Sequence, residues 1–457
     1  MPSFVRRALR LTVAVGLGAA TLAGIVAAGA AVIAQQSITQ VQAVAREGWP
    51  TPRASSADGP IVVAIVLGAS PTVASDVLAP YEVFASSPQF SVYTVAASGA
   101  PATLEGGPAV LPTHTFAEVD SGSVPRPDVV VVPAVAEPDG DRESPLRTFL
   151  IDQSARGTRI LGVCNGSAVL AATGLLDGRQ ATSHWSRIGA LQESRPQVTW
   201  VRGTRYVQDG SVTTTAGVTS GIPGALRVMA DLAGVDEAER VGRTLNYPGW
   251  AIGGSSGIPD QRFAWSDVPI GLNAIMPWLR PTVGIALADG DSEIDVAGAF
   301  EVYNVSYAAR AVALSTGDTI TTRHGLVLVT TPLGSAPAID RMLVPGARTE
   351  AEVAAPLSAW AAEHSVSPTP LNRSAAENGF DGALQQLAND TDSETAVSAA
   401  KMIDYPTDHL TLASPRVSWR APLLLTAAVL VAIGAGLLPG AIRRHRSRRA
   451  DPLRRAR

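Results

Sequence analysis

The sequence has one cysteine, Cys164, and one lysine, Lys401, in 457 residues. A single thiol excludes an intrachain disulfide and any metal site built from two or more cysteines. The six histidines are scattered, and no pair lies three or four residues apart, which argues against a metal site on one helix. A strong charge of one sign is also lacking, since the net charge is −4, and this argues against a nucleic-acid partner. We therefore expect no nucleic acid, no metal and no other cofactor.

Two long apolar runs without charge lie at 11–34 and 421–442, and each is long enough to cross a bilayer. The first run is longer than the apolar core of a cleaved signal peptide, which favours an uncleaved anchor; cleavage after it is the alternative. Arginines flank both runs on their terminal sides. By the positive-inside rule, this predicts a two-pass cell-membrane protein whose termini, 1–10 and 443–457, are cytoplasmic, with the main domains outside the cytoplasm.

The outer part begins with a polar stalk at 35–59 and continues with alternating strand and helix patterns over 60–248. The apolar runs "PIVVAIVLG", "FSVYTVAAS", "PDVVVVPA" and "TRILGV" are rich in β-branched residues, as is typical of buried parallel strands. Helical segments separate them. This alternation predicts an α/β fold with a doubly wound, mainly parallel, flavodoxin-like sheet.

The chain then repeats part of itself. After a linker at 249–280, residues 281–410 read as a shortened, degenerate second copy of the first domain. Between the Val-Pro strand end and the last matching helix, after Pro133 and after Pro345, the first copy has 87 residues and the second has 33. We therefore expect the second copy to lack the strand and helix that surround Cys164. The matches are 60–84 with 281–303, in which Asp76 and Glu82 correspond to Asp295 and Glu301, 129–134 with 341–346, and 221–248 with 379–406.

Cys164 lies in "LGVCNGSAVLAATGLL", where an apolar strand pattern turns sharply into a small-residue helix pattern. A strand–turn–helix of this kind is typical of a nucleophile elbow. The start of a helix stabilises a thiolate, so we expect a lowered pKa for Cys164. Gly166 is expected to permit the tight turn. The alternative is a buried, inert thiol, which is common for lone cysteines.

The stretch "GVCNGSAVLAATGLLDGRQATSHW" resembles the ThiJ/PfpI superfamily, whose fold is similar to that of class I glutamine amidotransferases. More narrowly, it resembles the branch of isonitrile hydratases and of the amino-terminal sensor domains of AraC-type regulators. "SDVLAPYEVFASSPQFSVYTVA", "VVVVPA" and "YVQDGSVTTTAGVTSGIPGAL" resemble the same branch, in the same order. The resemblance covers 60–248 well and 281–406 as a decayed copy.

The resemblance implies a set of site residues. In this superfamily an acidic residue from the first strand–helix turn contacts the thiol, and that position falls on Asp76. A carboxyl there can act as general acid and base towards Cys164. His184 either assists proton transfer or supports the packing. The candidate ligand contacts are Asn165, Gly166, Ala134 and Glu82, although the helical position of Glu82 also fits a structural role.

Two departures from the family pattern bear on activity. Asn165 stands where PfpI-type proteases carry histidine, which argues against a Cys-His peptidase. Ala134 and Val135 stand where the family commonly has two glycines, which puts an oxyanion hole in doubt.

Three functional classes remain open from the sequence. The first is a membrane-anchored, cysteine-dependent hydratase or hydrolase that acts on a small electrophile. The second is a non-catalytic sensor of a small molecule, like the sensor half of AraC-type regulators but without its own DNA-binding part. The third is a structural protein with a vestigial elbow. Because ThiJ/PfpI proteins commonly dimerise, we also expect the two copies to pack together as an intramolecular pseudo-dimer.

Overall fold

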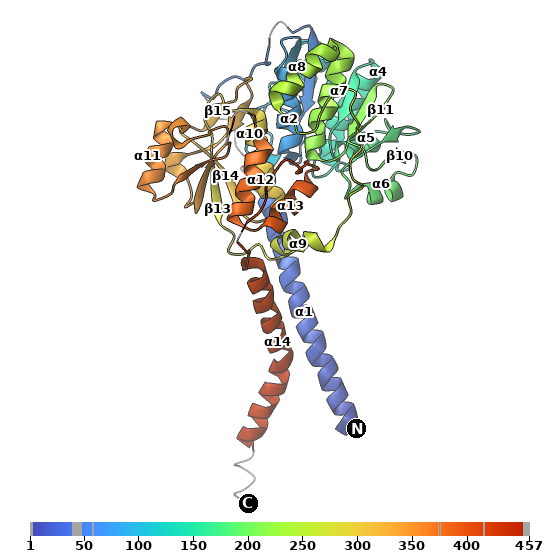
Figure 1. Ribbon diagram of the computed structural model, residues 1–457. Helices are drawn as coiled ribbons and strands as arrows, with labels where there is room; N and C mark the ends of the chain where they lie inside the picture. Colours follow the sequence, from blue (N-terminus) through green and yellow to red (C-terminus); the bar gives the residue numbers. More distant parts are fainter. Residues whose placement is uncertain are drawn as a thin grey trace, which may run out of the picture.

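The computed structural model describes residues 3–38, 48–56, 59–372, 374, 376–414 and 416–450. Two sheets, each covered by helices, stand on a pair of long helices (Figure 1). We call residues 59–248 the first unit and residues 281–414 the second unit. The predicted stalk at 35–59 and the predicted tail at 443–457 lie partly outside the described residues.

The first unit is built on a seven-stranded sheet with the strand order β11-β12-β8-β7-β1-β3-β6. All neighbouring strands are parallel except the antiparallel pair β11–β12. This order confirms the predicted flavodoxin-like, mainly parallel sheet. The strands are β1 (Ile61–Val66), β3 (Phe90–Ala96), β6 (His114–Thr115), β7 (Val129–Val132), β8 (Arg159–Gly162), β11 (Tyr206–Asp209) and β12 (Val212–Thr215).

Helices cover both faces of this sheet because its central strands are apolar on both sides. On β1, Val63 and Ile65 pack into the core beneath α2, α7 and α8, whereas Ala64 and Val66 pack into the core beneath α3, α4 and α5. Successive side chains of a strand point to opposite faces, so one six-residue run serves two cores. The helices are α2 (Ala74–Ala85), α3 (Phe116–Ser121), α4 (Ser144–Ala155), α5 (Gly166–Ala172), α6 (Ile188–Ser194), α7 (Gly221–Ala233) and α8 (Val235–Leu245).

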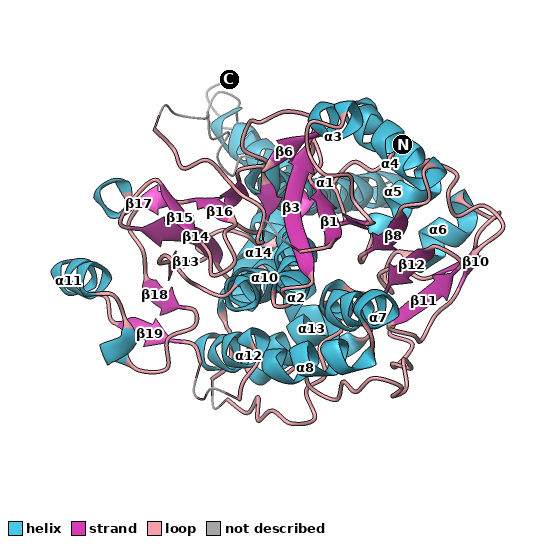
Figure 2. Cartoon of the chain, turned by 90° about the horizontal axis from the view of Figure 1, so that it is seen from above, coloured by secondary structure: helices cyan, strands magenta, loops and turns pink. Residues whose placement is uncertain are grey.

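The second unit has a five-stranded, all-parallel sheet with the order β17-β14-β13-β18-β19. One face packs on α11, and the other faces α10, α12 and α13 (Figure 2). The elements are β13 (Thr282–Ala286), α10 (Glu293–Ser306), β14 (Arg310–Ser315), β17 (Thr331–Pro332), β18 (Arg341–Val344), α11 (Ala355–Glu363), β19 (Pro368–Pro370), α12 (Gly379–Asp390) and α13 (Ser393–Met402).

Shorter elements connect and decorate the two units. In a three-stranded antiparallel sheet, β5 of the first unit pairs with β16 of the second, so main-chain hydrogen bonds join the units directly. These elements are β2 (Thr72–Val73), β4 (Leu104–Glu105), β5 (Ala109–Val110), β9 (Gln180–Ala181), β10 (Thr199–Trp200), β15 (Thr319–Thr321) and β16 (Val327–Val329), with 3₁₀ turns at Asp141–Glu143, Val218–Ser220, Trp265–Asp267, Leu333–Ser335 and Glu350–Glu352.

One sequence expectation about the second unit is wrong. We expected it to lack the strand that precedes the cysteine turn, but β19 lies beside β18 as β8 lies beside β7. Between β19 and α12, the described residues form no helix that corresponds to α5. The physical reason for the strand is that the edge of β18 would otherwise leave its backbone N–H and C=O groups unpaired, and a three-residue strand is enough to pair them.

The two units meet along α2 and α10, which lie side by side between the sheets (Figure 2). The contact is reciprocal. Glu82 of α2 accepts hydrogen bonds from Ser292 Oγ at 2.7 Å and from Ile294 N at 2.6 Å, at the start of α10. Glu301 of α10 accepts hydrogen bonds from the hydroxyl and backbone N–H of Ser75, at the start of α2. Each glutamate therefore caps the helix of the other unit by accepting hydrogen bonds at its start.

The long helices α1 (Ser3–Ile38) and α14 (Arg420–Ala450) pack against each other and extend away from both units (Figure 1). The segments Arg10–Ile33 and Arg420–Ile442 are long and apolar enough to cross a membrane by length and composition. The predicted linker is partly helical, because α9 (Val268–Ile275) packs on both long helices. The first residues of α1 and the last described residues of α14 lie at the same end, far from the sheets.

Candidate functional site

The predicted elbow is present between β8 and α5. Cys164 has a φ of +55°, a left-handed conformation that is unfavourable for a residue with a Cβ atom. Three hydrogen bonds hold the turn: Cys164 N donates to Thr215 Oγ1 at 3.2 Å, and the Cys164 carbonyl accepts from Ser167 Oγ at 3.1 Å and Ser183 Oγ at 3.3 Å. The strain therefore lies on the cysteine itself, as in nucleophile elbows of other folds.

Gly166 has a different role from the one expected. Its φ is not positive, so the turn does not need its conformational freedom. A Cβ atom at this position would instead overlap the carbonyl oxygen of Val132 at the end of β7. Glycine is required because α5 begins in direct contact with the neighbouring strand. Beside it, Asn165 Oδ1 accepts a long hydrogen bond of 3.4 Å from Ser183 Oγ, and the Asn165 backbone N–H faces the thiol.

Asp76 and Cys164 lie close enough for the charge of one to affect the other. Asp76 is in the first turn of α2 and is fully buried. Its Oδ2 accepts a hydrogen bond from Ala134 N at 3.0 Å, while its Oδ1 has no partner among the described residues. Burial is the main reason why the pKa of Asp76 is well above its ordinary value, and nearby Glu301 adds to the effect. The surroundings of Asp76 therefore favour the protonated form of its carboxyl.

The pKa of Cys164 differs from the sequence expectation. We expected it to be lowered by the start of α5, but it is raised well above its ordinary value. Burial is the largest cause, because only 6% of the residue is exposed, and the charge of Asp76 is the next. The hydrogen bond from the Asn165 backbone N–H lowers the pKa but is outweighed. The thiol is thus protonated at neutral pH, and a thiolate is disfavoured.

Residues 401–404, at the end of α13, bond to the loops around the elbow; we call them the 401–404 segment. The Ile403 carbonyl accepts from Thr219 N at 3.1 Å and from Thr219 Oγ1 at 2.9 Å. Asp404 Oδ2 accepts from Gly217 N at 2.6 Å, and the charge of Asp404 reaches the thiol. The second unit therefore forms part of the cysteine site, which the sequence did not predict.

His184 also faces this segment and not the thiol. Its Nε2 lies 2.7 Å from the Met402 carbonyl oxygen, and its Nδ1 lies 2.7 Å from Ser186 Oγ. A carbonyl oxygen only accepts, so Nε2 carries the proton. Burial lowers the pKa of His184 to about 4, so the ring is neutral at physiological pH. Of its two predicted roles, the arrangement fits polar packing support and not proton transfer.

The remaining candidate contacts do not form an oxyanion site. The backbone N–H of Ala134 is already bonded to Asp76, so it is not free for a substrate oxygen. Glu82 does not join the elbow at all, because its carboxylate caps α10. Glu301, which the sequence matched only to Glu82, lies instead near Asp76 and Cys164. The sequence repeat predicted that Glu301 lies on a helix. Only the packing of α10 on α2 shows that Glu301 lies near Asp76 and Cys164.

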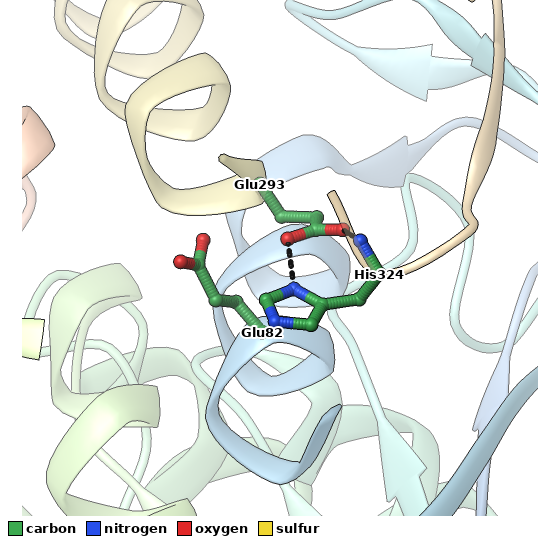
Figure 3. A group of neighbouring side chains, drawn as sticks. All are labelled: Glu82, Glu293 and His324. Atoms are coloured by element: carbon green, nitrogen blue, oxygen red, sulfur yellow. Dashed lines mark hydrogen bonds and ion pairs between the residues drawn. The ribbon is translucent and has the colours of Figure 1, made fainter. Parts of the chain in front are cut away.

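Glu82, Glu293 and His324 form a second cluster at the contact between the units (Figure 3). Their potential ligand atoms all lie within 4.8 Å of one another, close enough to hold a metal ion. The protein already pairs these groups, because His324 Nδ1 lies 2.8 Å from Glu293 Oε2. Burial lowers the pKa of His324, but the hydrogen bond and charge of Glu293 outweigh it and raise the pKa overall. Burial raises the pKa of Glu293, but the pKa is lowered in turn by its hydrogen bond to His324 and the charge of that ring, so the two groups favour an ion pair.

Comparisons with known proteins identify the family of the first unit. The profile of the DJ-1/PfpI family matches residues 62–231. An isonitrile hydratase of Pseudomonas putida is 37% identical over 180 residues, which are 38% of this chain and 72% of the relative. The HTH-type transcriptional regulator CdhR of Pseudomonas aeruginosa is 35% identical over 139 residues, which are 30% of this chain and 41% of the regulator.

Among solved structures, a ThiJ/PfpI family protein from Pseudomonas syringae is similar, with 31% identity and a TM-score of 0.37; the match covers 44% of this chain and 84% of that one. An AraC family transcriptional regulator from Pseudomonas putida has 20% identity and a TM-score of 0.35, with 40% of this chain and 97% of that chain covered. The family profile and the extent of the match to the hydratase establish the assignment that the elbow suggested: this chain belongs to the DJ-1/PfpI family.

Proposed function

We propose that the chain is a membrane-anchored sensor of a small molecule, in which the elbow cysteine contacts a ligand without turning it over. The observation that carries this proposal is the burial of Cys164 where residues 401–404 bond to its loops. A protonated thiol is a weak nucleophile, the Ala134 N–H is occupied, and His184 faces away. In this state the described residues around the thiol do not supply the thiolate, the free oxyanion donor and the base that hydrolysis needs.

The regulators among the relatives support the sensor class. In the proposal the first unit corresponds to their ligand-sensing part, as the match to CdhR over 139 residues suggests. Where such regulators continue into DNA-binding helices, this chain continues into the second unit and α14. We therefore propose that its output does not act through DNA.

We further propose that the second unit is a shortened copy of the first and that the two form an intramolecular pseudo-dimer. The reciprocal caps at Glu82 and Glu301 support this, since equivalent side chains make equivalent contacts in opposite directions. The strand orders support it too, because β14, β13, β18 and β19 follow one another as β3, β1, β7 and β8 do.

For location, we propose a two-pass arrangement in the cell membrane, with both units outside the cytoplasm. The apolar side chains of α1 and α14 are largely exposed, as expected for helices that face lipid. Both helices pack together, and arginines flank the apolar runs on their terminal sides.

An enzyme related to isonitrile hydratases is the second candidate. It is favoured by the 37% identity to such an enzyme and by the neighbouring Asp76 and Cys164. In this version the 401–404 segment moves aside, and Asp76 then transfers protons while the thiol adds to the electrophile.

One experiment separates the two candidates. The full chain in detergent micelles is treated with iodoacetamide from pH 6 to pH 10, and isonitrile consumption by the same preparation is compared with that by the Cys164→Ala protein. The sensor proposal expects alkylation to rise only above the ordinary thiol pKa of about 8.5, and it expects the wild type to consume isonitrile no faster than Cys164→Ala. A lower apparent pKa together with Cys164-dependent turnover would establish the enzyme and refute the sensor.

A further inference from the structure

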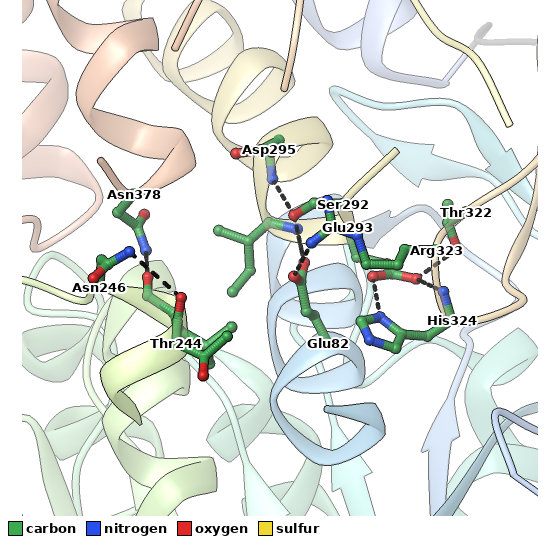
Figure 4. A network of polar contacts seen from close by, with 12 residues as sticks. Glu82, Thr244, Asn246, Ser292, Glu293, Asp295, Thr322, Arg323, His324 and Asn378 are labelled. Atoms are coloured by element: carbon green, nitrogen blue, oxygen red, sulfur yellow. Dashed lines mark hydrogen bonds and ion pairs between the residues drawn. The ribbon is translucent and has the colours of Figure 1, made fainter. Parts of the chain in front are cut away.

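A cavity of about 470 Å³ lies in the second unit where it meets the first. Its walls come from the start of α10, the start of α12 and the loops after β18 and β19, together with Glu82 of α2 and the end of α8 (Figure 4). The volume falls in the range of small-molecule sites, about 300–1,000 Å³. Most of the lining side chains are polar or charged.

The cavity lies at the place in the second unit that corresponds to the cysteine site. In the strand registers, Val132 pairs with Gly162, and Val344 pairs with Pro370. Cys164 comes two residues after Gly162, so the corresponding position is the one two residues after Pro370. That position is Asn372.

Asp76, the acidic neighbour of Cys164, also has a counterpart in the second unit. Asp295 corresponds to Asp76 in the repeat, and Asn372 Nδ2 donates to Asp295 Oδ1 at 3.1 Å. An aspartate–asparagine pair thus replaces the aspartate–cysteine pair. An amide is not a nucleophile, so this second site can bind a ligand but cannot form a covalent adduct through Asn372.

One polar atom at this site needs a partner. Asn372 Oδ1 is buried, and among the described residues none donates a hydrogen bond to it. An unpaired buried acceptor is unfavourable, and a ligand that carries an N–H or O–H group would satisfy it. Asp295 beside it is an acceptor for the same group.

Two cations border the same cavity. Arg323 lies 3.7 Å from Glu82 Oε1, a loose contact, and its side chain is 56% exposed. Arg348 pairs with Glu352 at 3.2 Å, and its side chain is 49% exposed. Each guanidinium has five N–H donors, so both retain donors for a carboxylate.

We propose that this cavity binds a small carboxylate that also carries a hydroxyl or amino group. The carboxylate bonds to Arg323 and Arg348, and the hydroxyl or amino group donates to Asn372 Oδ1 and Asp295. The proposal does not depend on whether Cys164 is catalytic, because the two sites use different residues.

The test is isothermal titration of the full chain in detergent micelles with matched pairs of compounds. L-Malate and L-glutamate carry the donor group, whereas succinate and glutarate are the same dicarboxylates without it. We expect at least one donor-bearing compound to bind about tenfold or more tightly than its partner, since a buried acceptor is otherwise left unpaired. If neither donor-bearing compound binds, or if the partners bind equally, the proposal is wrong.

Two variants locate the binding in this cavity. Arg348→Ala is expected to weaken binding of the carboxylate about tenfold or more, whereas Arg142→Ala, an exposed arginine of the first unit, leaves it unchanged. Asn372→Leu removes the unpaired oxygen, so we expect loss of the preference for donor-bearing compounds. It also removes the hydrogen bond to Asp295, so we expect a lower melting temperature, and a cooperative melting transition shows that the variant is folded. Full binding and full preference in both folded variants would overturn the assignment.

Discussion

The 401–404 segment should control access to the only thiol of the chain. Asp404 accepts a hydrogen bond from Gly217 N at 2.6 Å, and both groups are buried. Asp404→Ala removes this acceptor and leaves the N–H of Gly217 unpaired. We expect the segment to open more often and Cys164 to react faster with iodoacetamide.

The size of the effect follows from the hydrogen bond that is lost. An unpaired buried donor is unfavourable by about 1–3 kcal/mol, and 1.4 kcal/mol is a factor of ten in an equilibrium constant. When alkylation occurs from a rarely open state that closes rapidly, its rate is proportional to the population of that state. Asp404→Ala should therefore raise the alkylation rate about 5- to 150-fold. Because Cys164 is the only cysteine, the mass added to the intact chain reports this site alone.

Asp404→Asn is the matched control. The charge of Asp404 raises the thiol pKa, so removing it alone makes Cys164 somewhat more reactive. Asparagine also removes the charge, but its Oδ1 still accepts the hydrogen bond from Gly217. The ratio of the alkylation rates of these two proteins thus isolates the opening of the segment. If both react at the same rate, or if Asp404→Ala reacts like the wild type, the segment does not control the site.

Three other outcomes follow from the structure. Burial raises the pKa of Glu301 to about 7, so folding stability should fall by up to about 3 kcal/mol as the pH rises from about 4.5 to 7. In melting curves recorded across this pH range, Glu301→Gln should make the stability depend less on pH. Gly166→Ala should destabilise the fold by about 2–5 kcal/mol in denaturant titrations because its Cβ overlaps a β7 carbonyl, whereas Gly271→Ala, with open space around it, should be harmless. In a cysteine-free background, an impermeant maleimide added to intact cells should label Ser256→Cys but not Ser447→Cys; the reverse pattern contradicts the proposed topology.

Much of the first unit could be predicted from its sequence because its signals are local. The β-branched runs of β1, β3 and β7 and the helical segments between them define a parallel sheet without long-range information. The strands of the second unit were harder to predict. Its β19 reads "PTP", which has no strand signature, and it forms a strand only because the edge of β18 is available for pairing.

Some features of the cysteine site could likewise be predicted from local sequence, and others could not. Cys164 and its turn could be predicted because the strand–turn–helix signal lies within a few residues, and Asp76 followed from the family resemblance. The pKa of Cys164 could not, since it depends on burial and on Asp404, which is 240 residues away in the chain. His184 was ambiguous for the same reason, because its decisive partner, the Met402 carbonyl, belongs to the other unit.

In the proposed repeat, Asp76 and Asp295 occupy corresponding positions but have different surroundings. Asp76 lies beside a thiol within a closed site, whereas Asp295 is bonded to Asn372 at the edge of an open cavity. Asp76 follows Ser75, whose hydroxyl donates a hydrogen bond to Glu301 of α10. Asp295 follows Ile294, whose backbone N–H donates a hydrogen bond to Glu82 of α2. A shift of α10 along α2 would therefore change both aspartate environments together, because the capping bonds of Glu82 and Glu301 join the same two helix starts. The reciprocal caps thus hold the closed and the open site in a fixed relation, which an independent pair of domains would lack.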